Sequence, residues 1–223
     1  MHYSNIIDSV EKSIGTLCRE FQSRPNLFYT ENDIVCFFYN ILRQNLPNPF
    51  AKDKKGYEHL LIHGEYPTPF RCDMKGDRFE IKDDDETKFK RGHYDIVVLN
   101  PDFIRAHSYS IIKAQNYGEY QKQALSDISD YSPIVLYGIE FMFSRDPLKL
   151  SKGEDKERGV EGFVAKVLQD AKKLTETKKW NEGFIGHTKM LTFVKGSSHK
   201  IQGKIKRGLS KVEGNILIFG EDR

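Results

Sequence analysis

The stretch Ile134–Phe143, which reads Ile-Val-Leu-Tyr-Gly-Ile-Glu-Phe-Met-Phe, is the most apolar run of the 223-residue chain. A continuous apolar run of this length, extended to Pro133 and Ser144, predicts a strand that is covered on both faces of a sheet. A second β-branched run, 93–101, contains Ile-Val-Val-Leu and predicts another strand of the same kind. We therefore expect a sheet with a doubly covered centre.

The segments around these two strands predict the layers that cover them. Apolar residues at helical spacing predict amphipathic helices over 3–22, from Thr30 to the prolines at 47 and 49, and over 160–177. Alternating or apolar runs between turn signals predict strands over 70–74, 78–82, 188–194 and 215–219. This order of elements predicts a single α/β domain over 1–223, built on a mixed sheet flanked by helices, with a helical insertion over 102–132.

The composition excludes several classes of protein. Apolar residues make up 38% and charged residues 30% of the chain, which is typical of a globular domain rather than a disordered segment. The longest apolar run has ten residues and includes Glu140, whereas a membrane-spanning helix needs about 20 apolar residues. The first residues do not read as a signal peptide, and the three cysteines lie far apart. We therefore expect reduced thiols, a cytoplasmic protein and no membrane contact.

Two carboxylates in the predicted buried strands are the strongest chemical signal. Glu140 interrupts the apolar run, and Asp95 begins the other strand. A buried carboxylate is costly unless it is paired with a cation. If the two strands are neighbours, Asp95 and Glu140 form an oxygen site suited to Mg²⁺ or Mn²⁺. The alternatives are that Glu140 pairs with Arg91 or a tyrosine hydroxyl, and that Asp95 only begins its strand.

The ordered set of acidic motifs resembles the PD-(D/E)xK nuclease superfamily, which has the restriction-endonuclease-like fold. The matching residues are Glu31 near the start of an early helix, Asp95 and Glu140 in successive strands, and Asp170-Ala-Lys-Lys173-Leu174 in the following helix. The resemblance covers residues 28–175, within a core of about 28–194. It implies metal-dependent cleavage of phosphodiester bonds, in DNA more than in RNA. Asp95 and Glu140 would hold the metal and Glu31 would assist.

One position departs from the superfamily pattern. The motif has a lysine two residues after the glutamate, and this chain has Met142 there. Another cation could replace it, and the candidates are Lys82, Lys88, Lys90, Arg91, Lys166 and Lys173, with Lys90, Arg91 and Lys173 preferred. A helical wheel at 100° per residue turns Lys166 and Lys173 towards solvent, which counts against the helix. The alternative is a catalytically inactive protein that binds nucleic acid or serves as a scaffold.

Two further segments carry charge. Residues 195–211 are basic and glycine-containing and have no acidic residue, and they predict a loop that contacts phosphates through Lys200, Lys204, Lys206 and Arg207. The alternative for this segment is an ordinary solvated loop. The acidic run 83–86 is a rival metal site, although consecutive acidic residues are usually solvated. A homodimer is a further option, because nucleases of this type often pair to cut two strands.

Overall fold

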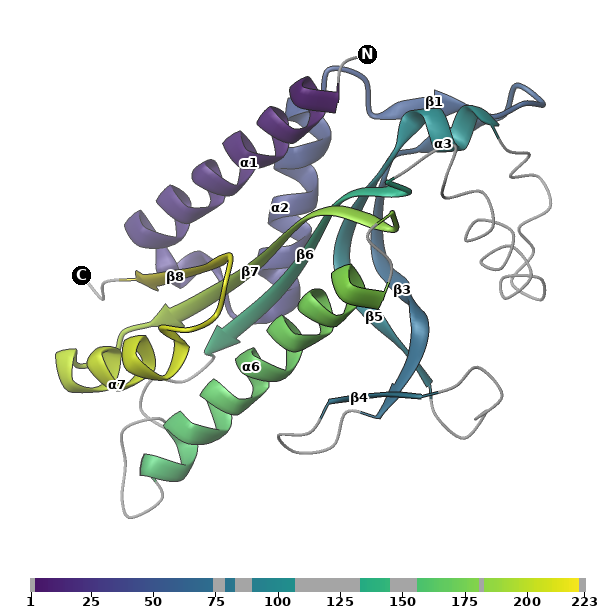
Figure 1. Ribbon diagram of the computed structural model, residues 1–223. Helices are drawn as coiled ribbons and strands as arrows, with labels where there is room; N and C mark the ends of the chain where they lie inside the picture. The colour runs from purple at the N-terminus through teal and green to yellow at the C-terminus, as the bar shows by residue number, and fades with distance from the viewer. Residues whose placement is uncertain are drawn as a thin grey trace.

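The computed structural model describes residues 3–73, 79–82, 90–106, 133–144, 156–180 and 183–220 (Figure 1). Its helices are α1 (Tyr3–Ser23), the short 3-10 helix η1 (Pro25–Leu27), α2 (Glu31–Asn45), α3 (Pro101–Ala106), α6 (Lys156–Trp180) and α7 (His199–Leu209). Its strands are β1 (Phe50–Lys52), β2 (Glu58–Leu60), β3 (Ile62–Asp73), β4 (Glu80–Lys82), β5 (Lys90–Leu99), β6 (Val135–Ser144), β7 (Ile185–Lys195) and β8 (Asn215–Gly220).

Six of these strands form one mixed sheet in the order β4-β3-β5-β6-β7-β8. The half from β4 to β6 is antiparallel, and β6, β7 and β8 run parallel. Parallel neighbours need crossover connections, and α6 and α7 supply them between β6 and β7 and between β7 and β8. Strands β1 and β2 form a separate antiparallel pair. The predicted mixed α/β sheet flanked by helices is confirmed.

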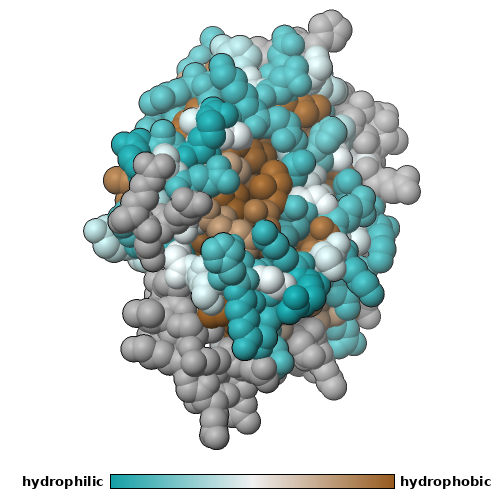
Figure 2. Space-filling model, turned by 90° about the vertical axis from the view of Figure 1, so that its left-hand side faces the viewer, coloured by the Kyte–Doolittle hydropathy of each residue, from teal (hydrophilic) through white to brown (hydrophobic). Residues whose placement is uncertain are grey.

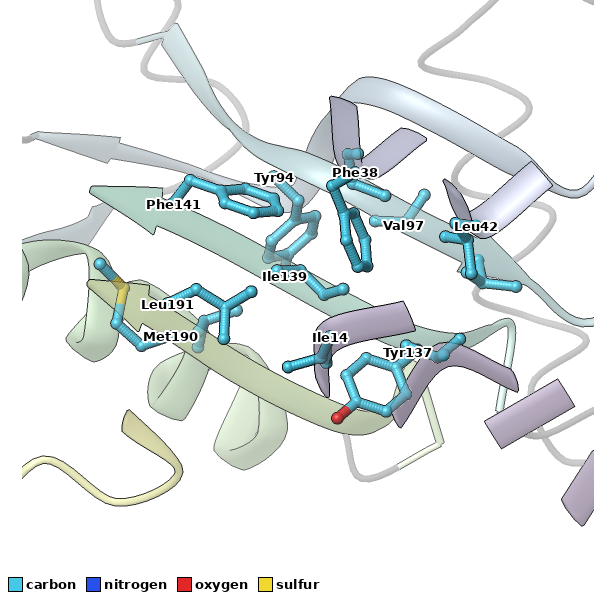
Figure 3. Packing of buried hydrophobic residues seen from close by; sticks show 14 of the residues in the cluster. Ile14, Phe38, Leu42, Tyr94, Val97, Tyr137, Ile139, Phe141, Met190 and Leu191 are labelled. Carbon is cyan, nitrogen blue, oxygen red and sulfur yellow. The ribbon is translucent and has the colours of Figure 1, made fainter. Parts of the chain in front are cut away.

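Helices cover both faces of the sheet, with α1 and α2 on one side and α6 and α7 on the other (Figure 1). Side chains of β6 alternate between these layers, as the strand pleat requires. Phe141 packs on Phe38 of α2, and their ring centroids are 5.5 Å apart. The ring centroids of Phe143 and of Phe21 in α1 are 6.1 Å apart. Figure 3 shows this core between the two helices and the sheet. Glu140 points to the other layer, where it meets α6.

The two N-terminal helices form where the sequence predicts them. In α1, Ile6, Val10, Ile14, Leu17 and Phe21 are buried at helical spacing. Thr30 caps α2: its side chain accepts a hydrogen bond from the Asp33 backbone N–H, and the Asp33 carboxylate accepts one from the Thr30 N–H. This capping box fixes where α2 begins, and it therefore fixes the position of Glu31.

The predicted basic loop over 195–211 is wrong, because most of this segment is the helix α7. Ile201, Ile205 and Leu209 are buried at a spacing of four residues. The burial of this apolar stripe outweighs the low helix propensity of the two glycines inside α7, Gly203 and Gly208. Gly208 even favours the packing, since a Cβ atom at this position would lie 2.9 Å from Val164 of α6. The helix keeps its basic residues, but it presents them from a rigid element.

The remaining predictions are met in part. The strands predicted over 188–194 and 215–219 are confirmed as β7 and β8, and the helix over 160–177 as α6, which is longer at both ends. Of the predicted insertion, 102–106 belong to α3, and 107–132 lie outside the described residues.

Figure 2 shows the side of the molecule where β8 forms the outer strand, with apolar atoms gathered at its centre. Among the described helices, none has the length and apolar character to span a membrane.

Candidate active site

The candidate site lies where β5 and β6 part. The pairing of β5 with β6 is regular from the pair Val98–Tyr137 to the pair Ile96–Ile139. After Ile96 and Ile139 the two strands form no further pair. On its other edge, β6 stays paired with β7 as far as Ser144. The separation leaves backbone N–H groups of β6 without β5 carbonyl acceptors, and such groups need partners when they are buried.

Two carboxylates supply these partners. Asp95 Oδ2 accepts a hydrogen bond from the Phe141 N–H at 2.6 Å, and Glu31 Oε2 accepts one from the Phe143 N–H at 3.0 Å. The two N–H groups are two residues apart, so they lie on the same edge of β6. The gap between the strands therefore holds two of the predicted acidic residues, one from β5 and one from the first turn of α2.

Glu140 and Lys173 form a buried ion pair on the α6 side of the sheet. Lys173 Nζ lies 2.7 Å from Glu140 Oε1, and the exposed fractions of the two residues are 4% and 2%. The ammonium also donates a hydrogen bond to the His93 carbonyl at 2.6 Å and lies 3.6 Å from Asp170 Oδ1. The described partner of Glu140 is therefore Lys173 rather than a tyrosine hydroxyl, and the Arg91 side chain lies outside the described residues.

The helical-wheel expectation for Lys173 is wrong. The wheel places Lys173 about a third of a turn from the apolar stripe, yet the residue is buried because β3 and β5 pack beside this part of α6. Gly92 of β5 makes room for it, since a Cβ atom there would lie 3.3 Å from Lys173 Cδ and 3.2 Å from Cys72 Sγ. Lys166, on the same flank two turns earlier, is exposed as expected.

The site carries more negative than positive charge. Burial is the main cause that raises the pKa of Glu140 well above its usual range and the pKa of Asp95 to about 7. Burial also raises the pKa of Asp170, and the attraction of Lys173 lowers all three. Burial alone would lower the pKa of Lys173, but Glu140 and Asp170 outweigh it and keep the ammonium charged. Among the described residues, one buried cation faces one buried and two partly buried carboxylates, an arrangement that favours an additional proton or metal ion.

The carboxylate oxygens of Asp95 and Glu140 are donors of the type that a hard divalent metal ion prefers. The buried Oε1 atom of Glu140, which lies 2.7 Å from Lys173 Nζ, has no hydrogen-bond partner of regular geometry among the described residues, and the recorded hydrogen bond of Asp95 uses Oδ2. Mg²⁺ binds through one or two carboxylates and completes its coordination with water and substrate oxygens. Among the residues the structure describes, no three acidic, histidine or cysteine side chains come together as a metal-binding group. The fit therefore rests on two carboxylates, with Glu31 at the neighbouring N–H group.

A cleft of about 500 Å³ lies beside the Glu31 carboxylate. It is lined by Glu31, Met142, Phe143 and Lys166, so the start of α2, the end of β6 and the middle of α6 meet there. Met142 is half-buried in its wall. The motif lysine position thus faces this cleft, while the buried cation comes from α6.

Of the other predicted cations, Lys82 and Lys166 lie in described parts of the chain, and Lys166 lines the cleft. Lys82 pairs with Glu80 at 2.8 Å, and the side chains of Lys90 and Arg91, like the whole of Lys88 and the acidic run 83–86, lie outside the described residues. The four predicted phosphate contacts lie together on α7: Lys200, Lys204, Lys206 and Arg207.

No model of a protein family matches the chain, and neither a curated protein nor a solved structure is similar to it.

Two features of the site were not predicted from the sequence. The first is Gly92, whose missing side chain admits Lys173. The second is the pair of β6 N–H groups that orient Asp95 and Glu31. A glycine three residues before a strand aspartate is a weak signal, but the strand separation has no signature in the sequence.

Proposed function

We propose that the protein is a metal-dependent nuclease of the PD-(D/E)xK type, with a restriction-endonuclease-like fold, that hydrolyses phosphodiester bonds in nucleic acid, in DNA more than in RNA. The observation that carries the proposal is the meeting of Asp95, Glu140 and Lys173 at the point where β5 and β6 part. Two carboxylates and one ammonium in one buried place suit a reaction that builds negative charge on phosphate oxygens.

Asp95 and Glu140 would hold Mg²⁺ or Mn²⁺, which when bound neutralises phosphate charge and lowers the pKa of water. The Phe141 N–H fixes the direction of the Asp95 carboxylate. Lys173 lowers the pKa of Glu140 against the effect of burial and offers its ammonium to a phosphate oxygen, since its contact with Asp170, at 3.6 Å, is looser than its other two. Glu31, held by the Phe143 N–H, would orient water from the side of the cleft.

A second candidate function is binding to nucleic acid, or to a protein as a scaffold, without cleavage. The observation that favours it is Met142, which gives the cleft a thioether where the motif has an ammonium. The basic residues of α7 suit both functions, because contacts with phosphates do not depend on catalysis.

Cleavage assays separate the two functions. Plasmid, linear, single-stranded and branched DNA and RNA are incubated with Mg²⁺ or Mn²⁺ and with wild-type protein, Glu140→Gln or Lys178→Gln. Lys178 is an exposed residue in the last turn of α6 and serves as the matched control. We expect cleavage by the wild type and the control and none by Glu140→Gln. Binding without cleavage of any substrate by the wild type would favour the second function, and cleavage by Glu140→Gln would refute the proposed site.

A further inference from the structure

Lys166 is an exposed cation whose place in the fold is not explained by packing. It lines the cleft with Glu31, Met142 and Phe143. Among the described residues, its recorded interaction is an electrostatic attraction to Asp170, which also lies beside Lys173. The Lys166 ammonium therefore lies at the solvent-exposed end of a series of charged groups. The series continues through Asp170 to the buried ion pair of Lys173 and Glu140.

The distance between Lys166 and Lys173 along α6 can be compared with the rise of a nucleic-acid strand. The two residues are seven positions apart on one flank of α6, which corresponds to about 10.5 Å along the helix axis. One strand of a nucleic acid rises about 3.4 Å per nucleotide, so this length covers about three nucleotides. A strand whose phosphate lies at Asp95 and Glu140 thus reaches Lys166 within a few nucleotides.

We propose that Lys166 binds a phosphate that flanks the scissile one, within about three nucleotides, so that the bound strand lies along the flank of α6 and over the cleft. This inference rests on the proposed function. Lysine suits the role because it contacts phosphate as a point charge and needs no fixed geometry. Met142 gives the cleft an apolar wall beside that contact, and Lys166 is its one cation among the described lining residues.

The test compares Lys166→Gln with the matched control Lys178→Gln in binding titrations between 50 and 200 mM salt, with Ca²⁺ in place of Mg²⁺. The probes are single-stranded and duplex DNA oligonucleotides that carry one uncharged methylphosphonate at each position in turn. Loss of one phosphate contact lowers the slope of log affinity against log salt by about 0.7–0.9, which is roughly a threefold difference over this range. We expect this loss in Lys166→Gln only. We also expect one methylphosphonate position near the cleavage point to weaken wild-type binding but not that of Lys166→Gln.

A second variant keeps the test independent of folding. Met142→Lys places an ammonium in the same cleft, and we expect it to restore the salt slope when combined with Lys166→Gln. Equal slopes for Lys166→Gln and the control, in a wild type that binds and cuts, would overturn this inference and leave the proposed function standing. A wild type that neither binds nor cuts nucleic acid would overturn both.

Discussion

The buried ion pair allows a quantitative prediction for the variant Lys173→Met. Methionine has a similar length and no charge, so the change removes the ammonium and keeps most of the packing. It leaves Glu140, which is 2% exposed, without its cation. Removal of one partner from a buried ion pair typically costs 3–5 kcal/mol. We expect the free energy of unfolding to fall by about that amount at pH 8.

The size of this loss depends on pH, with a sign that follows from the pKa of Glu140. Burial already raises this pKa above its unfolded value, and the loss of Lys173 removes the main effect that lowers it. Below the unfolded pKa of about 4.3 the carboxyl is protonated in both states, so the penalty is absent. It grows as the pH rises towards the folded pKa. At pH 4.5, close to the unfolded pKa, most of this penalty is gone, and we expect the loss of the hydrogen bond to the His93 carbonyl, about 1–2 kcal/mol, to dominate.

Urea unfolding followed by circular dichroism at pH 4.5 and pH 8 measures both values. Lys178→Met on the same helix is the control for loss of a lysine charge, and we expect it to change stability by less than about 0.5 kcal/mol. The double variant Lys173→Met with Glu140→Gln removes both charges and is expected to recover more than half of the loss at pH 8. Equal losses at the two pH values, or no recovery in the double variant, would refute the assignment of a charged buried pair.

Three further predictions concern the same site. Gly92→Ala crowds Lys173 Cδ and is expected to lower stability by about 1–3 kcal/mol and to slow cleavage, as urea unfolding and initial rates will show. Met142→Lys is expected to change the cleavage rate less than tenfold, because Lys173 already supplies the cation at Glu140 and residue 142 faces the cleft. Since the pKa of Asp95 is raised to about 7, protons compete with Mn²⁺ below that pH, and calorimetric titration is expected to show about tenfold weaker binding per pH unit below 7 and proton release on binding.

Much of the fold follows from the sequence because the periodicity of apolar residues reports burial directly. The doubly covered strand β6 and the amphipathic helix α1 have strong patterns, and both form where the patterns predict them. The helix α7 was missed because basic residues and glycines dominate its composition. Its three buried residues, Ile201, Ile205 and Leu209, nevertheless recur every four residues, so a helical signal was present in the sequence.

The acidic part of the site is predictable for a different reason. A carboxylate in an apolar strand needs a cation or a hydrogen-bond donor to offset the cost of its burial. Glu140 is therefore recognisable in the sequence as an unusual residue. The position of the cation is not predictable from α6 alone, because a helical wheel describes burial against one partner surface. Lys173 is buried by a second surface, the part of β5 around Gly92, where His93 and Tyr94 also contact α6. Such a contact depends on the curvature of the sheet, which no local pattern in the sequence records.

The energetics of the pair favour catalysis over simple binding. Replacement of both partners of a buried ion pair by apolar residues of similar volume is often neutral or stabilising, so the pair between Glu140 and Lys173 is weak evidence of a role in stability. Burial raises the pKa values of Glu140, Asp95 and Asp170, and the charges of Asp95 and Asp170 raise that of Glu140 further, so ionised carboxyls at this place cost stability. Contacts with phosphates need exposed cations such as those of α7, and they draw no benefit from buried carboxylates. A site that keeps charges at the expense of stability is typical of chemistry at that site, and this argument favours the nuclease over the inactive module.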